Sequence, residues 1–177
     1  MNLSDDEKRQ AVEGWRDQIN ASKGVICFSS TWENPVLWGH YADKHRGMAL
    51  GFEVKDDLLF RVRYENYRFE LPRDPVSNRA KPDEETVDRI LSTKFSDWKY
   101  ENEWRFFVKL EDVRPEPGLC FENFSEALKL TEVILGLKCE TPKEEIRDLI
   151  AATELTAKVI KARIAHDEFK VIEDNNV

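Results

Sequence analysis

Alternating apolar and polar side chains stand out most clearly in residues 98–108, where two carboxylates, one guanidinium and several aromatic rings lie close together in the sequence. Successive side chains of a strand point to opposite faces. Read in this way, the segment carries Glu101, Glu103 and Arg105 on one face and Tyr100 and Trp104 on the other. We therefore expect a central strand with one polar face and one face that packs into the core.

Two neighbouring carboxylates on one strand face repel each other unless a cation or solvent relieves the repulsion. Arg105 shares that face and is the candidate cation. One interpretation is an edge strand with a solvated, charged face. The other is a cleft in which one carboxylate binds a substrate and the other polarises its hydroxyl. In the second case we expect Glu101 and Glu103 to lie in a pocket with Arg105 and the helix that contains Trp38 and His45.

Apolar periodicity elsewhere predicts helices and strands in an irregular order. The predicted helices cover residues 4–20, 35–45, 83–95 and 141–152. The predicted strands cover residues 25–29, which we expect to be buried, 48–54, 60–64, 129–138, 159–164 and 169–172, and the last two form a hairpin-like pair. Residues 65–85 form a long connection, and residues 112–118 form a turn rich in proline. This order predicts a single α+β domain over residues 1–177, with a mixed, largely antiparallel sheet and flanking helices.

The helix predicted at residues 35–45 carries two histidines beside an apolar face. That face consists of Leu37, Trp38, Tyr41 and Ala42. His45 falls in the last turn, where a positively charged side chain meets the carbonyl end of a helix favourably, so a structural role is an alternative to ligand binding. His40 has no such local explanation and is a candidate catalytic group, although a single histidine on a helix is commonly structural.

Ser29, Ser30 and Thr31 follow the strand predicted at residues 25–29. Hydroxyl groups at the end of a strand are suitable hydrogen-bond donors for a ligand. They are also common capping and turn residues, and both interpretations stay open.

Composition narrows the class of protein. The 177 residues include five tryptophans and are 41% hydrophobic, which predicts a folded domain. The formal net charge of −8 lacks the basic character of a duplex-DNA-binding protein, so we expect nucleic acid only as a substrate. Three widely spaced cysteines suggest neither zinc nor a redox pair. We find no apolar run of about 18 residues and no signal sequence, so we expect a cytoplasmic protein without membrane contact.

Three segments together resemble a bacterial domain family. They are Cys27-Phe-Ser-Ser30, residues 35–52 with the sequence Trp38-x-His40-Tyr41-Ala42, and Lys94 followed by Trp98-Lys-Tyr-Glu-Asn-Glu-Trp-Arg105. The chain resembles the family of domains of unknown function numbered 2971 over residues 25–138, with a strand-helix-strand extension to residue 177. The resemblance also implies a further amino-terminal segment with an Asn-Asp-Pro turn, which this chain lacks or which precedes its first residue.

The order of Ser29-Ser30-Thr31 and Glu101-x-Glu103 is similar to the serine and Glu-x-Glu elements of ADP-ribosyltransferases, which cleave the nicotinamide bond of NAD. This resemblance implies a carboxylate that bonds a ribose hydroxyl and stabilises an oxocarbenium-like transition state. NAD is then a substrate, and no cofactor is expected with certainty. With the candidates from the rest of the chain, the expected catalytic residues are Glu101, Glu103 and His40. The expected ligand-binding residues are Ser29, Trp38, Tyr41, His45, Trp98 and Arg105.

Two alternatives remain open beside the enzyme. In one, a non-catalytic module binds a nucleotide or a protein by stacking on Trp38, Tyr41, Trp98 and Trp104. In the other, these aromatic residues only fill the core. We do not expect a metal site, because His40, His45 and the carboxylates show no recurrent ligand spacing.

Overall fold

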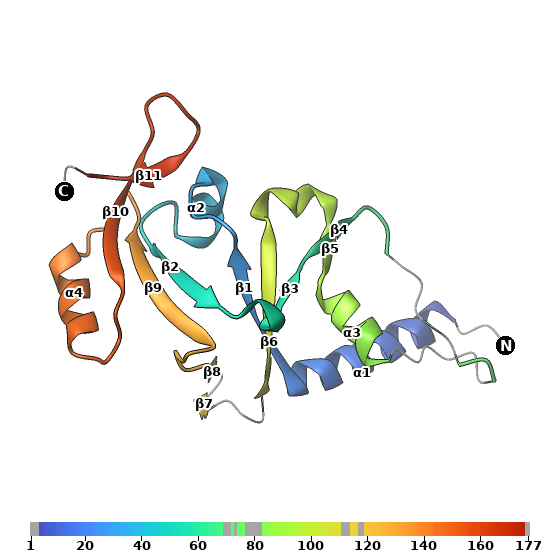
Figure 1. Ribbon diagram of the computed structural model, residues 1–177. Helices are drawn as coiled ribbons and strands as arrows, with labels where there is room; N and C mark the ends of the chain where they lie inside the picture. Colours follow the sequence, from blue (N-terminus) through green and yellow to red (C-terminus); the bar gives the residue numbers. More distant parts are fainter. Residues whose placement is uncertain are drawn as a thin grey trace.

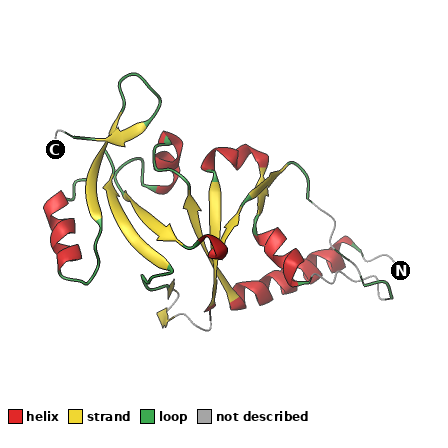
Figure 2. Cartoon of the chain, viewed as in Figure 1, coloured by secondary structure: helices red, strands yellow, loops and turns green. Residues whose placement is uncertain are grey.

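The computed structural model describes residues 4–68, 72, 74–76, 83–110, 114–116 and 119–175 (Figures 1 and 2). The described residues form four sheets, and the two larger ones, of three and four strands, lie next to each other. Most strand pairs are antiparallel, and two pairs are parallel. This arrangement confirms the predicted α+β class with a mixed, largely antiparallel sheet.

The first sheet contains β1 (Lys23–Ser29), β6 (Glu103–Lys109) and β3 (Leu59–Arg61) in the order β1-β6-β3. Both pairs are antiparallel. In the register of β1 and β6, Ser29 lies opposite Glu103 and Cys27 lies opposite Arg105. β1 was predicted to be buried, but Cys27 is exposed, because β1 is an edge strand in the described part of this sheet.

The second sheet has the order β11-β10-β9-β2 and contains most of the buried apolar residues. Its strands are β2 (Met48–Val54), β9 (Leu128–Leu135), β10 (Lys158–Ile164) and β11 (Val171–Glu173). β10 and β11 are antiparallel, which confirms the hairpin-like pair. β9 and β10 are parallel, and helix α4 (Lys143–Ala151) connects them as in a β-α-β unit.

Both faces of the second sheet are covered, which explains the continuous apolar run at the end of β9. Leu135 belongs to a cluster with Ile146 of α4 on one face. Ile134 points the other way and packs with Trp38 and Ala42. The segment that contains helix α2 (Pro35–Tyr41) is thereby held against the inner face of this sheet.

The remaining elements complete the described chain. They are helices α1 (Asp5–Ser22) and α3 (Glu84–Leu91), the 3-10 helices η1 (Asp56–Leu58) and η2 (Ser96–Glu101), the parallel pair β4 (Arg63–Glu65) and β5 (Thr93–Phe95), and the antiparallel pair β7 (Arg114–Glu116) and β8 (Leu119–Phe121). α1 and α3 lie near each other, at the opposite end of the molecule from α4 (Figure 1).

Two of the predicted elements are each interrupted, because part of the segment forms a strand that pairs with a different neighbour. The strand predicted at residues 60–64 breaks at Val62, where the chain leaves β6 and β4 begins to pair with β5. Val62 is buried, and its N–H donates to the carbonyl oxygen of Glu103 at 3.0 Å. The helix predicted at residues 83–95 ends at Leu91, because residues 93–95 form β5. Hydrogen bonds to a neighbouring strand therefore outweigh the local helical pattern.

The central strand begins later than its alternating pattern predicted. Tyr100 and Glu101 belong to η2, and Asn102 follows in the left-handed conformation with a φ of 44°. β6 begins at Glu103, so Tyr100 and Trp104 do not share a strand face. Tyr100 is 38% exposed and is not a core residue. Asparagine tolerates the left-handed conformation better than most residues, which suits it to this corner.

The helix predicted at residues 35–45 also differs at its end. Asn34 caps it as expected, accepting a hydrogen bond from the N–H of Val36 at 2.9 Å, and Pro35 is its first residue. However, α2 ends at Tyr41, and Asp43, Lys44 and His45 have positive φ values. His45 therefore lies in a turn after the helix and not in its last turn.

Some expectations fall on residues outside the described ones. Much of the connection predicted at residues 65–85 lies there, as do parts of the turn predicted at residues 112–118. Among the helices in the described part, none has both the length and the apolar composition required to cross a bilayer.

Candidate functional site

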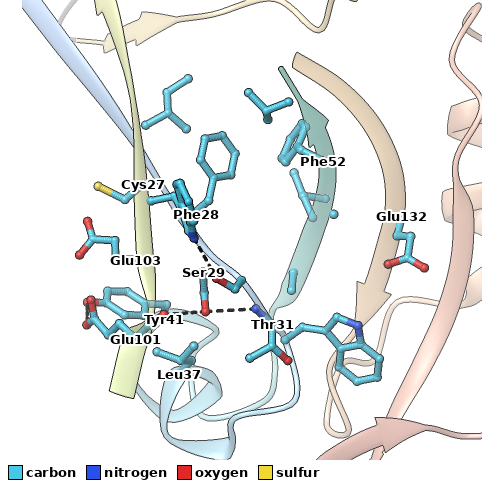
Figure 3. A pocket seen from close by; sticks show the side chains of 18 of the residues that line it. Cys27, Phe28, Ser29, Thr31, Leu37, Tyr41, Phe52, Glu101, Glu103 and Glu132 are labelled. Carbon is cyan, nitrogen blue, oxygen red and sulfur yellow. Dashed lines mark hydrogen bonds between the residues drawn. The ribbon is translucent and has the colours of Figure 1, made fainter. Parts of the chain in front are cut away.

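A cleft of about 970 Å³ lies between the two sheets (Figure 3). β1 and β6 contribute one wall, and β2 and β9 contribute the other. Phe28 and Phe52 face each other from the two walls in an edge-to-face contact, with ring centroids 5.7 Å apart. Most of the exposed lining is apolar. One group of polar side chains lies where α2, η2 and β6 meet, and Glu132 lies on the opposite wall (Figure 3).

Glu101 and Glu103 are the two buried carboxylates at this end of the cleft, each only 4% exposed. Glu101 is the last residue of η2 and Glu103 is the first residue of β6. The left-handed Asn102 between them turns the chain, and both carboxylates reach the same ammonium group, that of Lys94 on β5. The spatial pairing of these two glutamates thus comes from a turn between two elements, not from one continuous strand.

Two cations balance the two carboxylates. Lys94 Nζ bonds to Glu101 Oε2 and lies 3.0 Å from Glu103 Oε2. Arg105 Nε donates to Glu103 Oε1 at 2.8 Å, and its Nη1 donates to the carbonyl oxygen of Leu91. Buried charges are tolerated only when they are paired and hydrogen-bonded, and this cluster meets that condition. The expectation that Arg105 relieves the repulsion holds for Glu103, whereas Lys94 serves both carboxylates.

Residues from β1 and α2 complete the hydrogen bonds around Glu101. The Tyr41 hydroxyl donates to Glu101 Oε1 at 2.7 Å. The Ser29 hydroxyl donates to the main-chain carbonyl oxygen of Glu101 at 2.7 Å, and the Ser30 hydroxyl donates to that of Asn102 at 3.1 Å. The end of β1 is therefore attached to the corner between η2 and β6.

The surroundings set the ionisation of the cluster. Burial alone would raise the pKa of Glu103, but hydrogen bonds from Arg105, Lys94 and Cys27 outweigh it and lower the pKa to about 2. Cys27 is exposed as a residue, but its thiol is partly desolvated, and this partial burial and the hydrogen bond to Glu103 raise the pKa of the thiol to about 11. The hydrogen bond to Glu101, followed by burial, raises the pKa of Tyr41 to about 12. At neutral pH, Glu103 is a fixed anion, and the thiol and the phenol are neutral donors.

Three of the candidate residues lie outside the lining of this cleft. The His40 ring contacts Trp98, with centroids 6.0 Å apart, and Tyr100, with centroids 6.4 Å apart. Trp98 touches the cluster from behind, because Lys94 Nζ lies 4.9 Å from its ring centroid. Trp98 therefore lies beside Lys94 of the cluster and His40 lies beside Trp98, and neither residue lines the cleft.

His45 is the third residue outside the lining. It stacks on Trp38 with centroids 5.7 Å apart and an interplanar angle of 3°. Burial and the charge of Lys138 lower its pKa. This neutral, stacked ring does not fit the charged partner of a helix end that the sequence suggested.

Trp38 and Trp104, two of the tryptophans that line the cleft, differ in burial. Trp38 is 2% exposed, and its Nε1 donates to the carbonyl oxygen of Trp32 at 2.6 Å. Trp104 is only half-buried. Its Nε1 donates to the Ser30 hydroxyl at 3.0 Å, and the Arg61 guanidinium lies 5.8 Å from its ring centroid. Trp104 is therefore part of the cleft wall and not the deep core residue that the strand pattern predicted.

Sequence reasoning did not propose Lys94 or Cys27 as site residues. Lys94 stood in the quoted motif, and two neighbouring carboxylates require a second cation, so the charge balance was a usable signal. Nothing in the sequence identified which of many lysines supplies that cation.

Within the described ranges, no group of three or more histidine, cysteine, aspartate or glutamate side chains is arranged to hold a metal ion.

The fold and the site together define an α+β domain with a cleft between two sheets and a buried, ion-paired carboxylate cluster. The family model described as Protein of unknown function (DUF2971) matches residues 37–106. The matched segment contains both signature motifs, from Trp38 to Ala42 and from Trp98 to Arg105, and it supports the family expected from them. Neither a curated protein nor a solved structure matches the chain. Because the family description names no activity, function has to be argued from the site.

Proposed function

We propose that the cleft binds NAD and that the buried carboxylates promote cleavage of its nicotinamide–ribose bond, as in an ADP-ribosyltransferase-like enzyme. The observation that carries this proposal is the direct contact between the serine element and the Glu-x-Glu element. The Ser29 hydroxyl bonds to the Glu101 carbonyl oxygen although the two residues are 72 positions apart. Both elements line the same cleft. The cytoplasmic location expected from the sequence fits a reaction on NAD and is part of this proposal.

The chemistry requires a fixed negative charge. When the bond between ribose C1′ and the nicotinamide nitrogen breaks, its electron pair leaves with nicotinamide, and the ribose develops oxocarbenium character. Water or an acceptor group then bonds to C1′ and gives up its proton. A carboxylate held in place before the reaction stabilises the developing positive charge without reorganisation. Glu103 supports this role because Arg105 and Lys94 hold it ionised and oriented.

Glu101 has the better remaining capacity to accept a hydrogen bond from a ribose hydroxyl. An ionised carboxylate has about four acceptor positions. The side chain of Glu101 receives donors from Tyr41 and Lys94, whereas that of Glu103 receives donors from Arg105, Lys94 and Cys27. We assign ribose binding to Glu101 and charge stabilisation to Glu103.

The cleft itself suits a ligand with flat, partly apolar groups. Its volume of about 970 Å³ lies at the upper end of the usual range for ligand sites, about 300 to 1,000 Å³. Phe28, Phe52 and the half-buried Trp104 offer aromatic surfaces to planar rings. Such surfaces would support the nicotinamide or adenine ring by stacking.

A second candidate is a module that binds a nucleotide or a protein without chemistry. The observation that favours it is the charge balance of the cluster, in which Lys94 and Arg105 neutralise both carboxylates. A cluster of this kind can serve only to hold β5, η2 and β6 together. In that case the cleft would bind its ligand without using the charge of Glu103.

Incubation of the protein with NAD, alone and with protein, DNA or RNA as acceptor, distinguishes the candidates when nicotinamide release and NAD binding are both measured. For the enzyme, Glu103→Gln should reduce release by about 10²- to 10³-fold, the usual loss for one electrostatic group. Glu144→Gln on the exposed side of α4 is the matched control and should release nicotinamide like the unmodified protein. NAD binding without release would favour the module, and the absence of both would contradict an NAD site.

A further inference from the structure

We propose that Lys94 is a positioning residue that keeps Glu101 and Glu103 both ionised and oriented toward the cleft. Its consequence for catalysis rests on the proposed function, whereas its effect on the two carboxylates does not. Lys94 comes from β5, an element separate from the strand that carries Glu103. A single ammonium group thus links two acidic residues that a left-handed turn separates.

The position of Lys94 is well defined by its surroundings. Its Nζ contacts Oε2 of Glu101 and lies 3.0 Å from Oε2 of Glu103. The ring of Trp98 lies on another side of the ammonium group, 4.9 Å from Nζ to the centroid, where a cation is attracted by the aromatic face. The side chain is 22% exposed, so solvent screens these contacts only in part.

The charge balance shows why this one cation matters. Among the described residues, the titratable side chains in contact with the two carboxylates are Cys27 from β1, Tyr41 from α2, Lys94 from β5 and Arg105 from β6. The Tyr64 hydroxyl from β4 accepts a hydrogen bond from the main-chain N–H of Glu103 at 2.8 Å. The thiol and the phenol are neutral at pH 7, and Arg105 forms its ion pair with Glu103. Without Lys94, two buried carboxylates would share one cation, and their repulsion would favour the uptake of a proton by the pair.

A protonated pair would lose the charge that the proposed reaction needs. A neutral carboxylic acid offers no full negative charge to an oxocarbenium-like ribose, so the transition state would lose its main electrostatic support. Lys94 would then act on the reaction through the two glutamates and without touching the substrate. Lys94 also lines the cleft, but its ammonium group is already engaged by Glu101, Glu103 and the Trp98 ring, so we assign it to positioning and assign the substrate contacts to the two glutamates.

Carbon-13 NMR titration of the glutamate carboxyl groups between pH 4 and 8 tests the proposal without NAD. In the unmodified protein, Glu103 should not titrate in this range, because its pKa is about 2. In Lys94→Met, the Glu101 and Glu103 pair should take up one proton within the range, and Lys94→Arg should restore the ionised pair. Lys129→Met removes an exposed lysine and should change neither signal. If Lys94→Met shows no new titration, Lys94 does not keep the pair ionised and the proposal is wrong.

Two further measurements complete the test. If Lys94→Met is unfolded at pH 7, it should refold as the pH is lowered through the carboxylate range, because a proton then relieves the repulsion, and failure to refold would overturn the proposal. Nicotinamide release by Lys94→Met should be at least tenfold below that of the unmodified protein at pH 6 and should recover toward pH 8. A merely structural lysine would leave the shape of this pH profile unchanged. If the unmodified protein releases no nicotinamide while the NMR result holds, the proposed function fails and the role of Lys94 stands.

Discussion

Ser29 is the register partner of Glu103 across β1 and β6, and its hydroxyl bonds to the main-chain carbonyl oxygen of Glu101 at 2.7 Å. One residue at the end of an edge strand is therefore attached to both sides of the corner that presents the carboxylates. The corner between η2 and β6 is therefore held by a residue of β1, which is distant in the sequence. The same corner receives the Tyr41 hydroxyl from α2, so its geometry depends on three separate parts of the chain.

Tyr41→Phe should affect nicotinamide release through the orientation of Glu101 and should change the stability of the fold only slightly. The substitution removes a 2.7 Å hydrogen bond to a carboxylate, but the residue is 67% exposed, so we expect a loss of about 1 kcal/mol in the free energy of unfolding. If Glu101 binds the ribose, nicotinamide release should fall by about fivefold, because a loss of about 1 kcal/mol in transition-state stabilisation corresponds to that factor. Urea unfolding and the release assay measure the two effects. Tyr67→Phe is the control, since Tyr67 is 88% exposed. Unchanged release in Tyr41→Phe would remove Tyr41 from the site.

The pH dependence of stability should report the ionisation of Glu103. Its pKa is lowered from 4.5 to about 2 by the hydrogen bonds from Arg105, Lys94 and Cys27, which outweigh burial. A carboxyl group with a lowered folded-state pKa stabilises the protein above the unfolded pKa, and this contribution is lost as the pH falls through the folded pKa. The unfolding midpoint in urea should therefore decrease between about pH 4.5 and 2. Glu103→Gln should lose less stability than the unmodified protein over that interval, and equal losses would contradict a lowered pKa.

Trp38 and Trp104 should differ in their contribution to stability. Trp38→Ala removes a side chain that is 2% exposed and should lower the free energy of unfolding by about 3–5 kcal/mol. Because Trp104 is only half-buried in the structure, Trp104→Ala should cause a clearly smaller loss, about 1–2 kcal/mol. Urea unfolding compares the two, with Phe169→Ala as a control at a 98% exposed position. Equal losses for the two tryptophans would show that Trp104 is buried as deeply as Trp38.

Gly136 and Gly39 form a matched pair of alanine substitutions. A Cβ atom at Gly136 would lie 2.7 Å from the carbonyl oxygen of Gly47 and also collide with that of His45. Because backbone atoms cannot move aside easily, Gly136→Ala should be strongly destabilising, by several kcal/mol on the order of other severe core changes. Gly39 lies in α2 with no atom within 4 Å of such a Cβ, so Gly39→Ala should raise stability by about 0.5–1 kcal/mol. Thermal unfolding checks both signs. A well-tolerated Gly136→Ala would mean that the His45 turn does not pack on β9 as described.

The local sequence determined the elements whose signals lie within a few residues. The Asn34-Pro35 start of α2, the apolar run of β9 and the hairpin-like pair of β10 and β11 all follow from capping, hydrophobic periodicity and length. The α+β class followed from the order of these elements. The concentration of charged and aromatic residues at 98–108 also identified the position of the candidate site, because such a combination is uncommon on otherwise apolar elements.

Only the tertiary structure decided how the carboxylates are used and neutralised. The alternation at residues 98–108 suggested one strand, but long-range hydrogen bonds from Ser29 and Ser30 to the main chain hold a corner there, and Asn102 adopts the left-handed conformation that the corner needs. Lys94 became the shared cation because β5 pairs with β4, a contact that periodicity cannot specify. Burial, and with it the lowered pKa of Glu103, depends on how the segments pack together. Sequence periodicity reports which side of an element is apolar, but the partner that covers it is chosen by the packing of the whole chain.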